Sequence, residues 1–184
     1  MNLFQLIKSD YIKYKKYDSH FFAIVFFTQG FWAIFQYRFA HCIYKNVNWK
    51  LFRFPLLFLA LLWQKWIEII TGISIPSSVK IGHSFYIGHF GGIIINSNAV
   101  IGDNCNISQG VTIGVSGIKE NRGTPILGND VYVGANSVLA GKIQLGDNVV
   151  IGACSLVKDS FPDNAVILGV PAILISQKGS KGYI

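Results

Sequence analysis

The chain has 184 residues, of which 51% are apolar and only 14% are charged, and its formal net charge is +7. This length allows one domain, or one domain with a small appendage, and the apolar content excludes a disordered chain. The three cysteines show no CxxC spacing, and the N-terminus lacks the features of a signal peptide, so we expect free thiols in a cytoplasmic protein.

The positive charge is concentrated at the N-terminal end. Residues 1–72 carry nine Lys and Arg against three Asp and Glu, a net charge of +6, whereas the remaining residues carry seven against six. This break in composition predicts a boundary near residue 72 between two modules.

The N-terminal module, residues 1–72, is predicted to be helical. Apolar residues recur at helical spacing in 31–45, and 51–71 is apolar nearly all round, with Pro55 expected in its first turn. Neither stretch is a clean membrane span, because each uncharged run is interrupted or too short for a ~30 Å core. Basic residues beside many aromatic ones suit peripheral contact with an anionic membrane at its inner face. The alternative is a cap buried on the second module or on another subunit, and the two can coexist.

A repeat begins at Ile75. The chain there divides into twelve units, nearly all six residues long, each starting with Ile, Leu or Val and mostly followed by Gly. One aliphatic residue in six is too sparse for an amphipathic helix, and strict alternation is not sustained. Short strands separated by turns fit the pattern, with one aliphatic side chain per strand pointing inward. The repeat therefore predicts a solenoid whose stacked rungs bury a continuous aliphatic column.

Two departures interrupt the rhythm, an eight-residue unit at 93–100 and a break at 114–126. A solenoid tolerates insertions where they loop out of the coil. The break, "GVSGIKENRGTPI", is polar and rich in glycine, which makes it a candidate wall of a functional cleft. The final residues, 176–184, are predicted to form a basic flexible tail.

These motifs resemble the left-handed parallel β-helix of hexapeptide-repeat acyltransferases, and most closely the serine acetyltransferase branch. The resemblance extends to "QGFWAIFQYRFAH" (29–41), to "TGISIPSSVKIG" (71–82) and to "GVPA" (169–172). It implies a mainly β fold, with a left-handed β-helix over 73–175 after a small α-helical module. It also implies a homotrimer, acetyl-CoA bound in clefts between neighbouring β-helices, and transfer of an acetyl group to a hydroxyl or amine.

Within this resemblance, His89 in "IGHFGGIII" occupies the position of the catalytic histidine. A neutral imidazole can accept the proton of an attacking hydroxyl near neutral pH. Without the resemblance, a lone histidine in a repeat turn would be interpreted as a solvated surface residue. His83, one repeat earlier, is expected at the surface or lining the cleft.

Small residues could let acetyl-CoA lie close to the backbone, with peptide N–H groups available to the thioester oxygen. A lysine could in addition contact a phosphate of CoA. For each glycine the alternative is turn geometry alone. The candidate cofactor-binding residues are Gly114, Ser116, Gly117, Ala135, Ala153 and Lys158.

Several groups that hold serine in the resembled branch are missing. The acidic residue that orients the base is matched by Ser74, the acidic residue before the histidine by Gly88, and an Arg-His pair by Gly123-Thr124. A charged ligand buried without partners is unfavourable, so these losses argue against serine. The candidate acceptor-binding residues are His83, Gly88, Arg122 and Thr124.

We therefore predict an acetyl-CoA-dependent O-acetyltransferase that uses a histidine base and acts on a sugar hydroxyl of a surface polysaccharide or its precursor. One alternative is a serine O-acetyltransferase of cysteine biosynthesis. An alternative of another class is a non-catalytic solenoid for assembly or membrane docking, which would need no retained base.

Other chemistries are not expected. Zinc sites in some left-handed β-helices use three histidines, whereas only His83 and His89 lie in the repeats, so we predict no metal. Cys105 and Cys154 are expected to be small apolar fillers, not nucleophiles. We expect no nucleic-acid partner.

Overall fold

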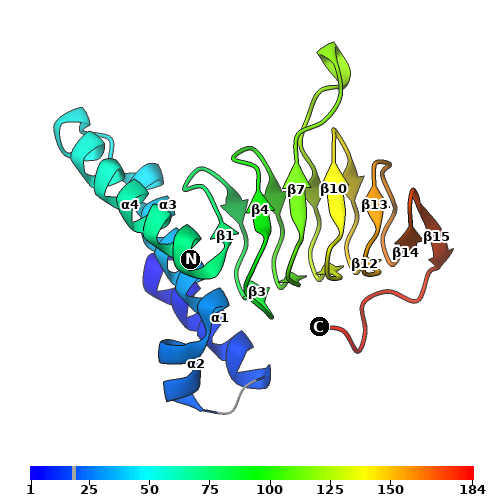
Figure 1. The fold of residues 1–184 in the computed structure, drawn as a ribbon, viewed down its shortest axis with the longest axis horizontal. Coiled ribbons are helices and arrows are strands. Elements are labelled where there is room, and N and C mark those ends of the chain that lie inside the picture. Colours follow the sequence, from blue (N-terminus) through cyan, green and yellow to red (C-terminus); the bar gives the residue numbers. More distant parts are fainter. Residues whose placement is uncertain (18–19) are drawn as a thin grey trace.

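The computed structural model describes residues 1–17 and 20–184. In these described residues, four helices precede the strands and pack against one end of the repeat region (Figure 1). They are α1 (Leu3–Tyr17), α2 (Phe21–Phe27), α3 (Gln29–Asn46) and α4 (Lys50–Thr71).

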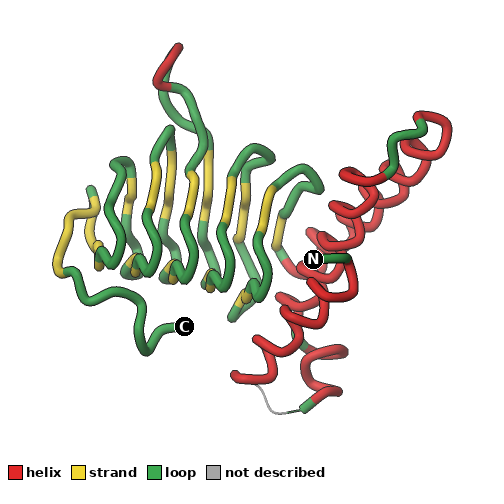
Figure 2. Tube along the Cα trace, turned by 180° about the vertical axis from the view of Figure 1, so that it is seen from behind, coloured by secondary structure: helices red, strands yellow, loops and turns green. Residues whose placement is uncertain are grey.

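Short strands then coil into a three-sided solenoid (Figure 2). Sheet A contains β1 (Ile73–Ser74), β4 (Ile93–Ile95), β7 (Thr112–Gly114), β10 (Val138–Ala140) and β13 (Leu156–Val157). Sheet B contains β2 (Lys80–Ile81), β5 (Val100–Ile101), β8 (Ile126–Leu127) and β11 (Gln144–Leu145). Sheet C contains β3 (Tyr86–Ile87), β6 (Asn106–Ile107), β9 (Tyr132–Val133), β12 (Val150–Ile151), β14 (Val166–Gly169) and β15 (Ala172–Ser176). All pairings are parallel except that of β14 with β15.

The core is the predicted aliphatic column. On sheet C, Ile87 lies beside Ile107 and Ile107 beside Val133, and all three side chains are buried. The residue that starts each of the twelve repeat units is at most 8% exposed. A strand of two or three residues directs alternate side chains to opposite faces, so it can bury only one or two of them. The predicted solenoid is therefore confirmed.

The two extra residues of the eight-residue unit lie earlier in the chain than 93–100, the unit to which the sequence analysis assigned them. Ile95 pairs with Ile113 on sheet A, so the spacing from Ile95 to Ile101 is regular, whereas the chain from Ile87 to Ile95 is two residues longer than a normal unit. The extra residues are therefore in the corner 88–92. Gly91 (φ +99°) and Gly92 (φ +67°) close this bulge in a conformation that side chains disfavour.

The break at 114–126 loops out of the coil, as predicted. It leaves between β7 and β8 and projects as an arm that contains a short 3₁₀ turn, η1 (Lys119–Asn121) (Figure 1). Two backbone hydrogen bonds between Ser116 and Gly123, of 3.1 and 3.0 Å, join the two sides of the arm.

The two predicted helical stretches lie within α3 and α4. Because α4 begins at Lys50, Pro55 lies in its second turn and not in the first, where it was expected. Gly72 ends α4 in the left-handed conformation, and its N–H donates to the carbonyl of Glu68 at 2.8 Å. Strand β1 follows at once.

A buried ion pair fastens the helices to the first rungs. The guanidinium of Arg38 on α3 donates to both carboxylate oxygens of Asp10 on α1, at 2.8 and 3.0 Å. Arg38 also donates to the carbonyls of Ile81 (2.9 Å) and Gly82, and Asp10 accepts the N–H of Phe85 at 2.9 Å. Both side chains are 1% exposed, so every polar atom of the pair is satisfied within the protein.

The C-terminal tail lies on sheet C, where a free tail was expected. The Tyr183 ring packs 5.0 Å from the Tyr132 ring, centroid to centroid, and Asn106 Nδ2 donates to the carbonyl of Tyr183 at 3.2 Å. Ser180 is 3% exposed. These contacts hold the tail across the outer side chains of β6 and β9.

Replacing Asp10 by Asn tests the ion pair, because it leaves the Arg38 guanidinium buried without its countercharge. We expect the free energy of unfolding to fall by about 3–5 kcal/mol in urea titrations followed by circular dichroism. Lys65→Ala is the matched control, since it removes an exposed pair with Glu68 and should cost less than about 1 kcal/mol. Equal stability of the two variants would show that the pair does not anchor the helices.

Candidate functional site

His89 stands on the bulged corner between sheets C and A. The N–H of Gly88 donates to Ile107 O at 3.2 Å, and that of Ile94 donates to Val111 O at 3.0 Å, so both ends of the bulge follow the next rung. The two residues in excess push His89 and Phe90 outward, and both side chains are exposed. The imidazole therefore reaches solvent because this corner is longer than its neighbours.

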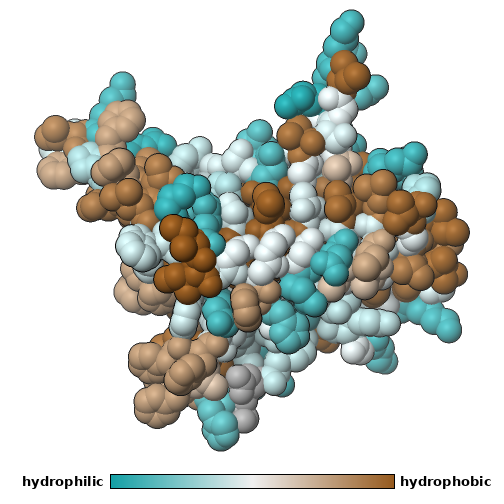
Figure 3. Space-filling view, viewed as in Figure 1, coloured by the Kyte–Doolittle hydropathy of each residue, from teal (hydrophilic) through white to brown (hydrophobic). Residues whose placement is uncertain are grey.

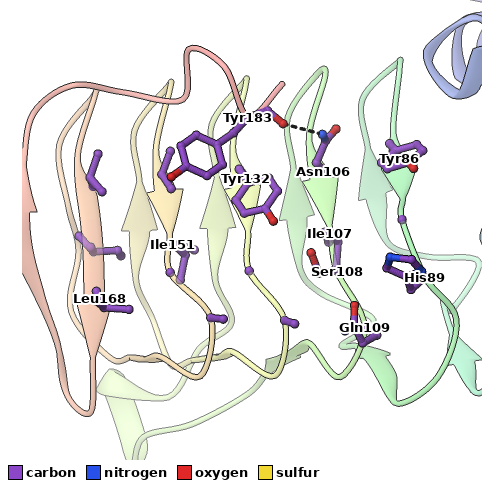
Figure 4. A pocket seen from close by; sticks show the side chains of 18 of the residues that line it. Tyr86, His89, Asn106, Ile107, Ser108, Gln109, Tyr132, Ile151, Leu168 and Tyr183 are labelled. Carbon is purple, nitrogen blue, oxygen red and sulfur yellow. Dashed lines mark hydrogen bonds between the residues drawn. The ribbon is translucent and has the colours of Figure 1, made fainter. Parts of the chain in front are cut away.

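A groove of about 630 Å³ runs along the outer face of sheet C, with His89 at one end (Figure 4). Its floor at the corner is made of small residues from successive rungs: Gly134, Ala135, Gly152 and Ala153. Four aromatic rings also line it, from α1, the sheet and the tail: Tyr17, Tyr86, Tyr132 and Tyr183.

The described lining of this groove is polar but uncharged. Among residues 1–17 and 20–184, it contains no Lys, Arg, Asp or Glu, and its polar side chains beyond the tyrosines are His89, Asn106, Ser108 and Gln109. Asn106 Nδ2 donates to Tyr17 Oη at 3.0 Å and to the carbonyl of Tyr183, so it links the end of α1 to the C-terminal tail above the sheet. Such a lining suits a ligand segment that is neutral and carries hydroxyl or amide groups.

The His89 ring has the freedom that a proton acceptor needs. Within residues 1–17 and 20–184, no hydrogen bond joins it to another group. A neutral imidazole nitrogen at the rim of a groove can accept the proton of a hydroxyl bound there.

Two peptide N–H groups on the groove floor are also unused. In the part of the chain that the structure describes, the amides of Ala135 and Ala153 donate to no acceptor, whereas those of Asn136 and Cys154 donate to Gln109 O (2.9 Å) and Ala135 O (2.8 Å). Peptide donors fixed in this way can bind carbonyl oxygens of a ligand.

A carboxylate that the sequence analysis missed lies beside Ser74. Ser74 Oγ donates to Glu68 Oε1 at 2.7 Å, and Glu68 also accepts from Gln64 (2.8 Å) and Lys65 (2.6 Å). Burial acts to raise the pKa of Glu68, but hydrogen bonds from Lys65, Ser74 and Gln64 outweigh it, so the pKa is lowered and the carboxylate stays ionised. The end of the helix at Gly72 is the sequence feature that could have indicated this contact, because the chain reverses there and brings β1 back past the last turn of α4.

The other predicted cofactor residues do not join this groove within one subunit. They lie along the opposite edge of sheet A, where strands pass to sheet B, or in the projecting arm. These residues are Gly114, Ser116, Gly117 and Lys158, together with the acceptor candidates Arg122 and Thr124.

The structure of the arm accounts for Gly123 and Thr124, which stand where the resembled branch has an Arg-His pair. Gly123 packs so closely on Lys142 that an added Cβ would lie 2.7 Å from Lys142 Cβ, so position 123 favours glycine. Thr124 Oγ1 donates to Asn98 O at 3.0 Å and holds the arm to the preceding rung. Arg122 is exposed.

His83 is not brought to His89. It lies at the corner between sheets B and C, with its Nε2 3.4 Å from Asp103 Oδ2 and its backbone N–H donating to Asp103 Oδ1 at 2.8 Å. Among the predicted acceptor residues, only Gly88 therefore shares the groove with His89.

The two repeat cysteines differ. Cys105 is buried, as predicted, and burial raises its pKa to about 12. Cys154 is exposed in a turn with φ +57°, so its interpretation as a buried filler was wrong. Its place in the repeat is a corner position, where the side chain points to solvent.

Comparisons with known proteins agree on one family. The family model described as bacterial transferase hexapeptide (six repeats) matches residues 124–159. The chain is 35% identical over 152 residues to a serine acetyltransferase of Synechococcus elongatus, covering 83% of this chain and 59% of that protein. It is 31% identical over 161 residues to a serine acetyltransferase of Bacillus subtilis, covering 88% and 70%. The chain thus spans 59% to 70% of the length of these relatives.

Solved structures give the same result. A serine acetyltransferase from Brucella abortus in complex with coenzyme A matches with a TM-score of 0.84 and 29% identity, covering 95% of this chain and 68% of that one. A serine acetyltransferase from Neisseria gonorrhoeae in complex with serine matches with a TM-score of 0.82 and 26% identity, covering 95% and 69%.

Proposed function

The chain belongs to the hexapeptide-repeat transferases, among the relatives of serine acetyltransferase, and we propose that it transfers an acetyl group from acetyl-CoA to a hydroxyl with His89 as general base. The family and the left-handed β-helix predicted from the sequence are confirmed. The observation that supports the activity is the exposed imidazole at the end of a groove with unused peptide donors.

The proposed step needs only one proton acceptor. His89 takes the proton of the acceptor hydroxyl as the oxygen forms a bond to the thioester carbonyl carbon. The carbon–sulfur bond then breaks, and the imidazolium returns the proton to the departing thiolate. The products are an acetyl ester and the free thiol of CoA, and His89 is again neutral.

The groove floor fits the donor. The pantetheine arm of CoA is neutral and carries amide groups, and the groove lining is neutral, with peptide N–H groups at Ala135 and Ala153. The small side chains on this floor let such an arm lie against the backbone. The groove residues would hold the acyl donor, which brings the thioester that reacts.

A second copy of the chain completes the proposed site. The projecting arm and Lys158 lie on the far edge of sheet A from His89, so one subunit does not bring them together. In a trimer with neighbouring β-helices side by side, the arm of one copy can cover the groove of the next. Sheet A offers an apolar outer surface at Ile94 (55% exposed) and Val138 (36% exposed) for such packing.

The similarity to serine acetyltransferases supports L-serine as the acceptor, in place of the sugar hydroxyl predicted from the sequence. A matching structure contains serine, and the chain aligns with serine acetyltransferases over most of its length. With Gly88 in place of an acidic residue and Gly123-Thr124 in place of an Arg-His pair, we expect serine to bind weakly.

A sugar hydroxyl is the second candidate, and the groove lining favours it. Among the groove residues that the structure describes, none has a charged side chain for an ammonium or carboxylate group. It offers tyrosine rings, on which the C–H faces of a sugar ring can pack, and amide and hydroxyl groups for hydrogen bonds.

Replacing His89 by Ala tests the base. We expect kcat for acetyl-CoA turnover to fall at least ~100-fold, with CoA binding kept, because only the proton acceptor is lost. His83→Ala is the matched control, since His83 lies at another corner, and it should stay within about twofold of wild type. Equal effects of the two substitutions would exclude His89 as the base.

The shared site is tested by combining two variants that each have lowered activity. Cutting the arm 115–123 to a short Gly-Ser link should lower turnover, and sedimentation should show a trimer in every variant. Co-expressing arm-cut copies with His89→Ala copies should restore part of the activity, because mixed trimers contain grooves with an intact His89 and an intact arm from different copies. An active monomer, or no recovery in mixed trimers, would contradict the shared site.

Gly88→Asp tests the acceptor. An added Cβ at Gly88 would meet only the Tyr86 ring, at 3.3 Å, so a carboxylate can be placed there. If L-serine is the acceptor, its KM should fall roughly tenfold, the effect of one charge-assisted hydrogen bond, while Gly88→Asn should show less gain. If neither wild type nor Gly88→Asp acetylates L-serine and a neutral oligosaccharide is acetylated, the sugar candidate is correct.

A further inference from the structure

The solvent side of α4 is a continuous apolar surface. Ala60 and Gln64 face α3 and are buried, whereas the opposite side presents large apolar residues that are 46% to 79% exposed. We call this set the α4 face: Leu51, Phe58, Leu62, Trp66 and Ile69. Apolar side chains gather over the helical end of the molecule in Figure 3. An exposed surface of this kind marks a site of interaction.

The charges around the α4 face have one sign. Among residues 1–17 and 20–72, every exposed side chain that carries a formal charge is a lysine; they are Lys8, Lys15, Lys16, Lys45, Lys50 and Lys65. The two described carboxylates are not free, because Asp10 is buried against Arg38 and Glu68 is hydrogen-bonded to Lys65. A second copy of this surface would bring lysines against lysines, whereas an anionic surface complements them.

The packing of α4 determines how it can meet such a surface. By length and composition α4 could cross a membrane, and it is the one helix of the described residues that could. However, Gln36 Nε2 on α3 donates to Ala60 O at 3.2 Å, and α3 is fastened to the β-helix through Arg38. Gly72 leads straight from α4 into β1. A crossing would break these contacts, so α4 stays packed along α3 with one face free.

We propose that the α4 face docks on an anionic lipid bilayer, with the helix lying in the interfacial plane. Trp49, at the start of the helix, and Trp66 are 75% and 66% exposed, and tryptophan favours the membrane interface. Lys45 and Lys50 beside Trp49 would meet the lipid phosphates. The proposal does not depend on which acceptor the groove takes.

Flotation of the full-length protein with vesicles tests the proposal. With equal parts of phosphatidylglycerol and phosphatidylcholine we expect the protein to float, and with phosphatidylcholine alone to float much less. Phe58→Glu/Leu62→Glu should lower vesicle binding at least roughly tenfold, because two apolar side chains that would be buried in the bilayer are replaced by charged ones. Lys45→Ala/Lys50→Ala should lower it roughly fivefold per lysine on anionic vesicles only.

The control and the readout distinguish docking on lipid from docking of a second copy of the chain. Ile173→Glu, an equally exposed apolar position on β15 at the far end of the β-helix, should float as wild type does. Vesicles should shift the tryptophan emission of wild type to the blue, and less so that of Trp66→Phe. Absence of flotation, or flotation unchanged in Phe58→Glu/Leu62→Glu, would overturn the proposal. Sedimentation showing that this variant dissociates an oligomer, without loss of lipid binding, would assign the α4 face to a second copy.

Discussion

Each face of a rung is two or three residues wide, so the repeat region is stable only if every face buries an aliphatic side chain on top of the one below. Ile87, Ile107 and Val133 form one such stack, with parallel pairing that keeps their neighbours in register. This register places the corner residues of successive rungs in columns. The floor of the groove is one of these columns, at Ala135 and Ala153, so its shape follows from the packing of the core.

The residues proposed to act in catalysis lie where the coil contains more residues than a regular repeat unit. Two extra residues at the corner 88–92 expose His89, and the arm at 114–126 is the wall that we propose a neighbouring copy uses. Neither insertion disturbs the aliphatic stack. A rigid solenoid can therefore hold an exposed proton acceptor and a long loop at little cost in stability.

The sequence could predict the features that depend on the six-residue period of the repeat. It could not predict those that depend on which corner of the β-helix a residue occupies. The period predicted the buried column and the arm, whereas the resemblance to the serine acetyltransferase branch led us to assign His89, Ala135 and Ala153 to one site. His83 and His89 follow the same Ile-Gly pair, but consecutive units turn at different corners, so one contacts Asp103 and the other enters the groove. The Ser74–Glu68 contact and the tyrosine wall depend on how α4 and the tail fold back, which no repeat encodes.

The central claim is that His89 acts on a thioester held in the sheet C groove. A crystal structure of the protein with CoA tests it most directly, because the position of the sulfur is measured. The account predicts the pantetheine arm along Ala135 and Ala153, with the sulfur within ~4 Å of the space beside the His89 ring where an acceptor oxygen can attack. The account would be contradicted if the CoA sulfur were ordered at the corner of His83. It would also be contradicted if the sulfur lay out of reach of His89 in every copy of the chain.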